Sequence, residues 1–309
     1  MSRCLVTGHR GYIGTKLFKR LKELGHEVLG IDIQEGHDIN SDLFHGLDKK
    51  SFHPLYYKFK PEYIFHLAYI PRVFYSVENP VETTQNNVLV TTNVLNFAKA
   101  VDAHRVIFSS SSSVLGDGEG PLSPYALQKL YAEMECRLWS KIYGLDTVSL
   151  RYFNVYSEDQ QAETAYATAI ANWMHHIKSG KAPFINGDGH QRRDMLHVDD
   201  VISANIFAME HEGVFRGNVY DVGTGTNISL NEVIDIVHSY FPAVEFENRP
   251  PRKGDVLLTK ANTLPLKKLG WHANISIEEG IKNCFGELYA HMCGKGRSAL
   301  RNQNYIQRN

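Results

Sequence analysis

MSRCLVTGHRGYIGTKLFKRL, residues 1–21, contains three glycines, at positions 8, 11 and 14. The residues before them, 3–7, read as a short buried strand, and apolar side chains recur at helical spacing after the last glycine. In a turn of this kind Gly8 permits the tight bend, Gly11 lets the backbone approach a pyrophosphate, and Gly14 lets the helix pack closely on the strand. The order of strand, glycine turn and helix therefore predicts the first half of a dinucleotide-binding unit.

A second strand is predicted over residues 27–33 and carries Asp32 near its end. A carboxylate there accepts hydrogen bonds from the adenosine ribose hydroxyls, and its charge repels a 2′-phosphate, which favours NAD over NADP. Arg10, inside the glycine turn, has the opposite tendency, because a guanidinium can pair with a 2′-phosphate. We expect NAD, bound by the glycines together with Tyr12 and Ile13 at the start of the helix, where unpaired N–H groups face the phosphates.

Strands and helices alternate over the first half of the chain, which predicts an α/β fold with a Rossmann-type, doubly wound parallel sheet. We expect an NAD-binding domain over residues 1–157 and a smaller C-terminal α/β substrate lobe over residues 158–309, part of which packs back on the first domain. Gly25 can close the first helix, while Ser123 can cap a later helix that Gly144 ends. The other predicted elements are strands over residues 62–68, 105–111 and 146–156 and helices over residues 81–101 and 124–143.

Composition excludes several classes of protein. The chain has 309 residues, 43% of them hydrophobic, and its 33 basic and 34 acidic side chains nearly cancel, so no nucleic-acid partner is expected. There is no run of 18 apolar residues and no apolar leader at the N-terminus, so we expect no membrane association. The four cysteines form no metal-ligand set, which favours reduced thiols in a cytoplasmic protein without a structural metal.

Tyr125 and Lys129 lie four residues apart, on one face of the predicted helix. A phenol is a poor base at its ordinary pKa of about 10, and a neighbouring ammonium stabilises the phenolate and lowers that pKa. Five serines, 109–113, end the preceding strand, where a hydroxyl can bond to the substrate oxygen that the tyrosine deprotonates. These groups follow a dinucleotide turn at the carboxyl ends of successive strands, and together they predict an active site.

With these motifs the chain resembles the extended short-chain dehydrogenase/reductases of the NAD-dependent epimerase/dehydratase group. Within that group it is most similar to UDP-glucose and UDP-N-acetylglucosamine 4-epimerases, over residues 3 to about 282. The matching segments are TGHRGYIG at 7–14, HDI at 37–39, HLA at 66–68, Asn87, FSSSSSV at 108–114, YALQK at 125–129, RYFNVY at 151–156, GDGHQRRDMLHVDDV at 187–201 and RKGD at 252–255.

The resemblance implies a role for each matching position. Tyr125 is the catalytic base, Ser111 the catalytic hydroxyl, and Lys129 the partner of the base and a ligand of the nicotinamide ribose. The resemblance places four further residues near the cofactor, namely Asp38, Ile39, Ala68 and Asn87. It places five residues near the sugar nucleotide, namely Asn154, Arg193, Arg252, Asp255 and Thr259.

Three departures from the family pattern bear on function. Only thirteen residues separate Ser111 from Tyr125, so the loop over the site is short. Positions 112 and 113 are serines where 4,6-dehydratases carry an Asp-Glu pair, which removes the acid that water elimination needs. Pro71 lies in a stretch where some epimerases have a lysine near the cofactor.

The function implied is inversion of C4 of a UDP-hexose, through transient oxidation to the 4-keto sugar and non-stereospecific return of the hydride. Two alternatives stay open. One is an NAD(P)-dependent nucleotide-sugar dehydrogenase or 4-keto reductase of the same fold. The other is a non-catalytic NAD-sensing module, against which the intact serine, tyrosine and lysine argue.

The resemblance also implies a substrate and a partner. FINGDG at 184–189 and AYATAIANW at 165–173 are most similar to epimerases of UDP-N-acetylhexosamines, and Thr259 leaves room for an acetamido group where a tyrosine would fill the pocket. We therefore expect interconversion of UDP-GlcNAc and UDP-GalNAc, alone or beside the plain hexoses. We also expect a homodimer in which residues 82–101 and 124–143 of two copies form a four-helix bundle.

Overall fold

The computed structural model describes residues 1–43, 52–71, 73–160, 162, 168–251 and 257–294. The chain forms two compact units. The first takes in the described residues of Met1–Tyr152, Asp199–Val222 and Asn262–His272, and the second those of Phe153–Val198, Gly223–Ala261 and Ala273–Asn309. Where the sequence predicts a domain boundary after residue 157, the chain first passes between the units after Tyr152, and two later segments belong to the first unit.

A six-stranded parallel sheet forms the centre of the first unit, in the order β10-β5-β4-β3-β1-β2, which confirms the predicted Rossmann-type fold. The order reverses between β1 and β3, the position at which open α/β sheets bind ligands beyond the carboxyl ends of their strands. The strands are β1 (Arg3–Thr7), β2 (Glu27–Ile31), β3 (Tyr63–His66), β4 (Arg105–Ser111), β5 (Asp146–Tyr152) and β10 (Asn218–Val222).

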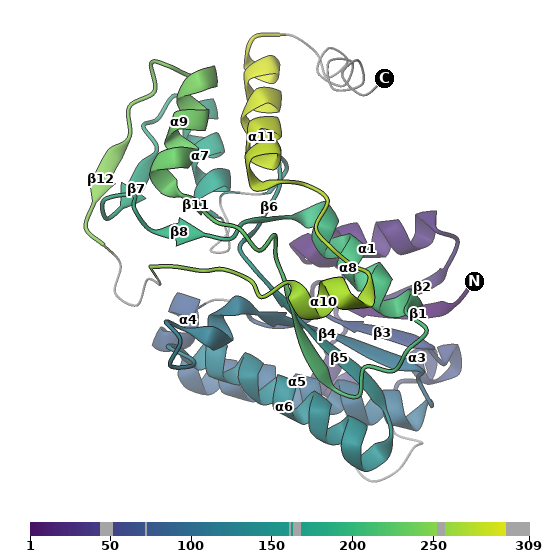
Figure 1. The fold of residues 1–309 in the computed structure, drawn as a ribbon. Helices are drawn as coiled ribbons and strands as arrows, with labels where there is room; N and C mark the ends of the chain where they lie inside the picture. Colours follow the sequence, from purple (N-terminus) through teal and green to yellow (C-terminus); the bar gives the residue numbers. More distant parts are fainter. Residues whose placement is uncertain (44–51, 72, 161, 163–167, 252–256, 295–309) are drawn as a thin grey trace. The chain divides into compact units, whose positions relative to one another are not determined.

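Helices cover both faces of this sheet. Figure 1 shows α5 and α6 along one face, with α1 and α8 on the other. The longer helices are α1 (Tyr12–Glu23), α5 (Pro80–Ala100), α6 (Pro124–Tyr143) and α8 (Val198–Glu210). The short ones are η1 (Ile33–Glu35), α2 (Ile39–Asp42), α3 (Pro54–Phe59), α4 (Val73–Glu78), η3 (Ser112–Leu115) and α10 (Leu264–Leu269).

The predicted helix ends are confirmed where cap chemistry is strong. The Ser123 hydroxyl accepts a hydrogen bond from the Ala126 N–H at 3.2 Å, and Gly144 ends α6 in the left-handed region at φ +70°. Gly25, at φ +82°, closes α1 in the same way. Both helices therefore end at glycines that adopt the left-handed conformation, and α6 also begins at a residue that favours the N-cap position.

Three predicted strands are shorter than expected. The strand over 62–68 is reduced to Tyr63–His66, because the parallel pairing with β1 and β4 ends at His66. The strand over 27–33 ends at Ile31, because the Asp32 side chain caps η1 by accepting from the Gln34 N–H at 3.0 Å. The strand over 146–156 is broken at Asn154, whose φ of +32° interrupts the extended backbone. The residues after the break, Val155–Tyr156 (β6), pair with a strand of the second unit instead.

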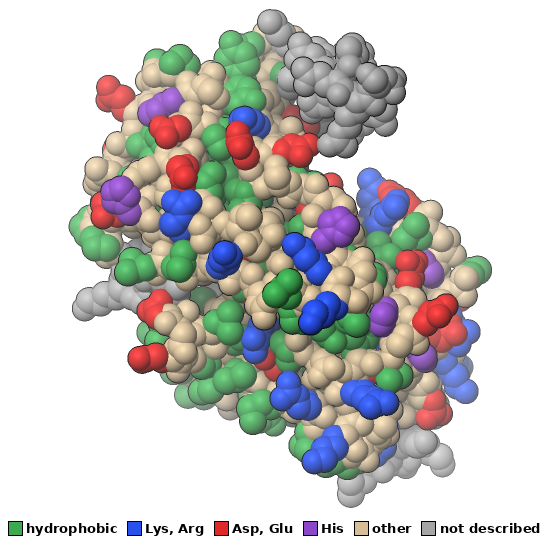
Figure 2. All heavy atoms as spheres, viewed as in Figure 1, with side chains coloured by type: hydrophobic (Ala, Val, Ile, Leu, Met, Phe, Trp, Pro, Cys, Tyr) green, Lys and Arg blue, Asp and Glu red, His purple; other side chains and the backbone are tan. Residues whose placement is uncertain are grey.

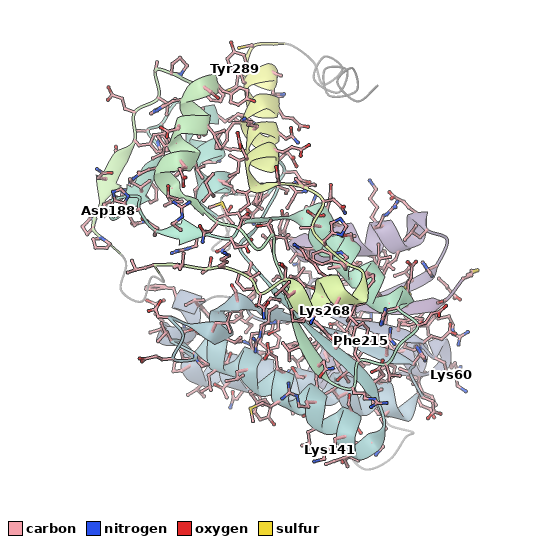
Figure 3. All side chains as sticks on the ribbon, in the orientation of Figure 1. Lys60, Lys141, Asp188, Phe215, Lys268 and Tyr289 are labelled. Atoms are coloured by element: carbon pink, nitrogen blue, oxygen red, sulfur yellow. The ribbon has the colours of Figure 1, made fainter. Side chains whose placement is uncertain are left out.

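Arg105 anchors the later segment of the first unit. Its fully buried guanidinium pairs with Asp146 at 2.6 Å and donates to the carbonyl oxygens of Ala208 and Gly213 at 2.6 and 2.7 Å. It also lies 4.7 Å from the ring centre of Phe215, a residue labelled in Figure 3. The cation thus satisfies carbonyls that the end of α8 leaves unpaired.

In the part of the second unit that the structure describes, three helices surround an apolar core of their own. Trp173, Val233 and Phe285 are buried in it, one from each helix. The helices are α7 (Ala169–Lys178), α9 (Leu230–Tyr240) and α11 (Ile277–Met292). Three two-stranded sheets join β6 to β9 (Leu196–His197), β7 (Phe184–Asn186) to β12 (Glu247–Arg249), and β8 (Arg192–Arg193) to β11 (Ile228–Ser229).

Charged side chains of both signs are exposed on the protein. Both acidic and basic side chains lie on the face shown in Figure 2, with basic ones gathered in its lower middle. Among the helices described, none combines the length and apolar character that crossing a membrane requires.

The glycine turn brings β1 and α1 into close contact. Gly8 adopts φ +71°, and its N–H donates to the Ile31 carbonyl at 2.9 Å. A Cβ atom on Gly14 would collide with the Gly8 carbonyl, whereas one on Gly144 would meet open space. The turn therefore requires glycine at position 14 for steric reasons.

We expect Gly14→Ala to lower the free energy of unfolding by more than Gly144→Ala does. The second variant only places alanine in the left-handed region, at a cost of roughly 1–2 kcal/mol, whereas the first must also open the turn. Urea unfolding of the two variants beside the native protein measures the difference. Equal losses would contradict the steric argument.

Candidate active site

The carboxyl edge of the parallel sheet brings together segments that are far apart in the sequence. The glycine turn follows β1, Ala68 follows β3, and Ser111 ends β4. A Cβ atom on Gly8 would lie 2.8 Å from the Ala68 nitrogen, so these two backbones are in direct contact. The structure therefore places these predicted residues on one edge.

The glycine turn fits a dinucleotide phosphate. Gly11 is the N-cap of α1 and has no side chain, and the first turn of the helix, which includes Tyr12 and Ile13, carries no acidic residue. The N-terminal end of a helix favours an anion through its dipole and its first amides. With Gly14 allowing the close approach of helix and strand, these residues fit NAD.

Asp32 is held at the end of β2 by two backbone amides. It is buried, and its Oδ2 accepts from the Arg10 N–H at 2.9 Å while its Oδ1 accepts from Gln34. The structure therefore fixes this carboxylate next to the glycine turn, as a ribose ligand requires. Further along, Asp38 caps α2 by accepting from the Asn40 N–H at 2.9 Å, and Ile39 is buried in the first turn of that helix.

Lys129 lies in a small aromatic pocket on the inner face of α6. Its Nζ donates to the Ser109 carbonyl at 2.6 Å and lies 3.6, 4.7 and 5.9 Å from the ring centres of Tyr69, Phe108 and Tyr125. Burial lowers the pKa of Lys129 to about 7. The ammonium is therefore costly here unless a negative group pairs with it.

Tyr125 occupies the first turn of α6 and is buried. Its N–H donates to the Ser76 hydroxyl of α4 at 3.0 Å, which ties the start of the helix to the segment after β3. Because Tyr125 and Lys129 are separated by one helical turn, both side chains project from the same face.

The Ser111 hydroxyl oxygen accepts two hydrogen bonds from Ser113. Ser111 Oγ accepts from the Ser113 N–H at 3.2 Å and from the Ser113 hydroxyl at 2.9 Å. Since a hydroxyl has one O–H donor and two acceptor positions, the donor of Ser111 is left to bind an oxygen.

Asn87 is fully buried and positions the segment after Ala68. Its Oδ1 accepts from the Ile70 N–H at 2.8 Å, and its Nδ2 donates to the Ile70 carbonyl at 3.2 Å and to Gln128 Oε1 at 2.7 Å. Gln128 is the neighbour of Lys129 in α6, so Asn87 links the loop after β3 to α6.

Sequence reasoning did not find three residues around this site. Tyr69 stacks its ring on the Lys129 ammonium, and its hydroxyl donates to the Gln128 carbonyl at 3.0 Å. Glu133, one turn beyond Lys129, accepts from Arg151 Nε at 2.8 Å and from Arg151 Nη2 at 2.7 Å. Tyr69 could have been predicted, because it is an aromatic residue directly after the HLA motif. The Glu133–Arg151 pair could not, because it joins α6 to β5 and becomes visible only in the folded structure.

In the second unit, three predicted substrate residues lie around one buried carboxylate. Asn154 Nδ2 donates to the Thr259 hydroxyl at 3.0 Å and to the Asp194 carbonyl at 2.8 Å. The Asp194 N–H also donates to the Thr259 hydroxyl, at 3.1 Å, and Arg193 precedes it in β8. Arg252 and Asp255, together with residues 165–167 of the AYATAIANW segment, lie outside the described residues.

The Asp194 side chain holds this arrangement in place. It is fully buried, and it accepts from the N–H groups of Thr224, Gly225 and Ala261 at 2.9 to 3.0 Å and from the Thr224 hydroxyl at 2.8 Å. Burial raises its pKa, and these four donors oppose that rise. No local pattern in the sequence indicates this role.

Comparison with known proteins agrees with the geometry. Residues 4–223 match the model of the NAD dependent epimerase/dehydratase family. UDP-glucose 4-epimerase of Mycolicibacterium smegmatis is 32% identical over 303 residues, which cover 90% of this chain and 96% of that protein.

Two solved structures are also similar. UDP-N-acetylglucosamine 4-epimerase of Methanobrevibacter ruminantium, in complex with UDP-N-acetylmuramic acid, is 27% identical with a TM-score of 0.81, over 94% of this chain and 99% of its own. UDP-glucose 4-epimerase of Thermus thermophilus, in complex with NAD, is 28% identical with a TM-score of 0.79, over 93% and 98%. This chain belongs to the NAD-dependent epimerase/dehydratase family, and its cofactor is NAD.

Proposed function

We propose that this protein is a nucleotide-sugar 4-epimerase in which Tyr125 and Ser111 act on the sugar 4-hydroxyl. The observation that carries the proposal is the buried Lys129 ammonium group, fixed on the Ser109 carbonyl beside the Tyr125 ring. When NAD is bound, it supplies the acceptor and donor of hydride at C4. All other steps fall to side chains of this chain.

Proton transfer follows from the charges in the aromatic pocket. Burial favours the neutral amine of Lys129, and a phenolate next to it restores the ammonium by pairing with it. Tyr125 as phenolate takes the proton of the 4-hydroxyl and later returns it, while the Ser111 O–H donates a hydrogen bond to the same oxygen. The proton count is unchanged over one cycle, as an epimerisation requires.

Two alternatives within the fold are less well supported. Ser112 and Ser113 offer hydroxyls instead of the carboxyl acid that water elimination needs, which argues against a dehydratase. A reductase or dehydrogenase would consume a nicotinamide cofactor in each turnover. Incubation with UDP-sugars and no added reductant separates the cases, because only an epimerase reaches a stable mixture of 4-epimers without net oxidation or reduction.

We expect Tyr125→Phe to lower turnover by about 10²–10⁴-fold, the usual contribution of general-base catalysis. Tyr131→Phe is the matched control, since Tyr131 lies on the same helix with 44% of its surface exposed. Both variants should keep the native melting temperature. Turnover of Tyr125→Phe close to that of Tyr131→Phe would remove Tyr125 from the mechanism.

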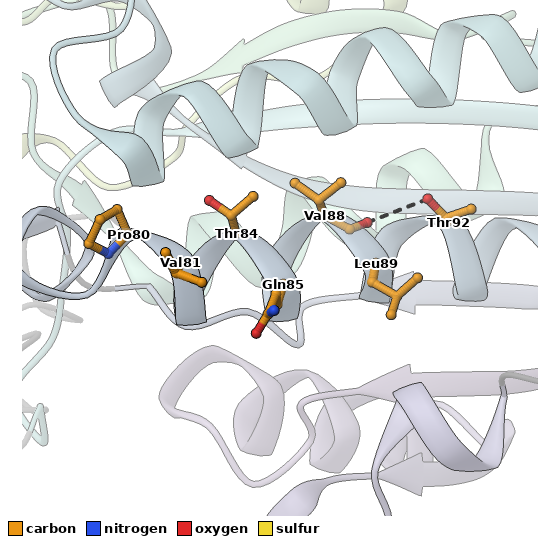
Figure 4. A pocket seen from close by; sticks show the side chains of 7 residues that line it. All are labelled: Pro80, Val81, Thr84, Gln85, Val88, Leu89 and Thr92. Carbon is orange, nitrogen blue, oxygen red and sulfur yellow. Dashed lines mark hydrogen bonds between the residues drawn. The ribbon is translucent and has the colours of Figure 1, made fainter.

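A second copy of the chain is the partner that we propose. The outer sides of α5 and α6 expose apolar side chains, among them Val81 (70% exposed) and Met134 (65% exposed). Along α5 they border a hollow of about 560 Å³. Figure 4 shows its lining residues, Pro80, Val81, Thr84, Gln85, Val88, Leu89 and Thr92. Pairing of these helices with those of a second copy would bury this apolar surface in a four-helix bundle.

Met134→Glu should dissociate the dimer, because it places a carboxylate in the middle of the apolar face. Val214→Glu, at a position 57% exposed and outside α5 and α6, is the control and should leave the assembly unchanged. Light scattering at micromolar concentration should give twice the chain mass of 35.0 kDa for native protein and control. A native particle of single-chain mass would refute the dimer.

For the substrate we propose UDP-N-acetylhexosamines, alone or beside the plain UDP-hexoses. The similar M. ruminantium structure is of a UDP-N-acetylglucosamine 4-epimerase, which supports this choice. The other support is the size of Thr259, which is small for a residue expected to close the sugar pocket. Its hydroxyl accepts two hydrogen bonds within the unit, so any test must separate loss of these bonds from added bulk.

Thr259→Tyr should suppress turnover of UDP-GlcNAc and UDP-GalNAc while sparing UDP-Glc and UDP-Gal, since overpacking beside the 2-substituent costs about 1–3 kcal/mol. Thr259→Val removes the same hydroxyl without adding bulk and should affect both pairs of sugars alike. Chromatography of the products measures each rate. Native protein that turns over only the plain hexoses would contradict the proposal.

A further inference from the structure

Glu35 binds both basic side chains of the glycine turn. Its Oε1 accepts from Arg10 Nε at 2.6 Å, and Arg10 Nη2 contacts the same oxygen. Its Oε2 lies 3.1 Å from Nε2 of the buried His9 ring. Pairing with Arg10 holds the pKa of Glu35 below its usual range, so this carboxylate is ionised at neutral pH.

The short helix η1 fixes Glu35 close to Asp32. Asp32 caps η1 and binds the Arg10 N–H, while Glu35 is the last residue of η1 and binds the Arg10 side chain. Gly36, at φ +79°, ends η1 directly afterwards. Two carboxylates three residues apart therefore hold the backbone and the side chain of one arginine.

Gly30 makes room for this arrangement. A Cβ atom at that position of β2 would collide with the His9 ring. The Nδ1 atom of His9 is buried and has no hydrogen-bond partner among the described residues, so the contact of its Nε2 with Glu35 orients the ring. The turn, the strand and η1 thus pack around the Glu35 carboxylate.

The charges at this place oppose a phosphate. Asp32 and Glu35 carry two negative charges against the single positive charge of Arg10. A phosphate monoester brings about −1.5 to −2 at neutral pH. Without the charge of Glu35, the charges of Asp32 and Arg10 would cancel. The guanidinium would then be available for bidentate binding of phosphate oxygens.

We propose that Glu35 makes this site select NAD over NADP, by occupying the Arg10 guanidinium that would otherwise bind a 2′-phosphate. Asp32 repels a 2′-phosphate, whereas a free Arg10 guanidinium would attract one. Pairing with Glu35 removes that attraction. This selection between NAD and NADP does not depend on the identity of the sugar or on the epimerase reaction.

The test is the affinity of Glu35→Gln for each cofactor. Titrations with NAD and with NADP, followed by quenching of protein fluorescence and by the melting temperature, need no sugar and no turnover. We expect Glu35→Gln to bind NADP about tenfold more tightly than the native protein, as one added charge-assisted contact allows, with NAD affinity little changed.

Two further variants make the result specific. In Arg10→Ala/Glu35→Gln the gain should disappear, because it depends on the released guanidinium. Glu27→Gln, which changes the net charge equally at the other end of β2, should not alter the preference. Native NADP affinity in a folded Glu35→Gln, or a gain that persists without Arg10, would overturn the proposal.

Discussion

Parallel alignment of the six central strands is the constraint on which the first unit depends. Because all strands run in one direction, their carboxyl ends meet at one edge, and the chain must cross back over a face of the sheet after each strand. More than 40 residues lie between the glycine turn and Ala68, and again between Ala68 and Ser111. Yet all three follow neighbouring strands of the sheet. The site exists because that edge collects them.

Three buried charges of the molecule are compensated in different ways. Arg105 has a carboxylate and several carbonyl oxygens, Asp194 has four neutral donors, and Glu133 has the Arg151 fork. Removing one partner from such a set leaves an uncompensated charge, which typically costs about 3–5 kcal/mol. These three side chains fasten distant segments within their own unit.

Lys129 differs from them. Among the described residues it has a carbonyl and aromatic rings within reach but no paired carboxylate, and burial lowers its pKa to about 7. Burying a lysine without a paired carboxylate has a cost to stability, and groups with such shifted pKa values cluster at functional sites. His66, nearby and fully buried, has its pKa lowered to about 3 by the same burial and by Lys129, and it stays neutral.

The sequence by itself determined the features that depend on neighbours along the chain. These include the alternation of strands and helices, the glycine turn, the Ser123 and Gly144 caps, and the one-turn spacing of Tyr125 and Lys129, because propensity, sterics and cap chemistry act over a few residues. Only the tertiary structure decided that Glu35 holds Arg10 and that Asn154 breaks its strand. It also decided that Asp194 meets Thr259, 65 residues away. Such contacts depend on how separate elements are placed against one another, and no local pattern of side chains specifies that placement.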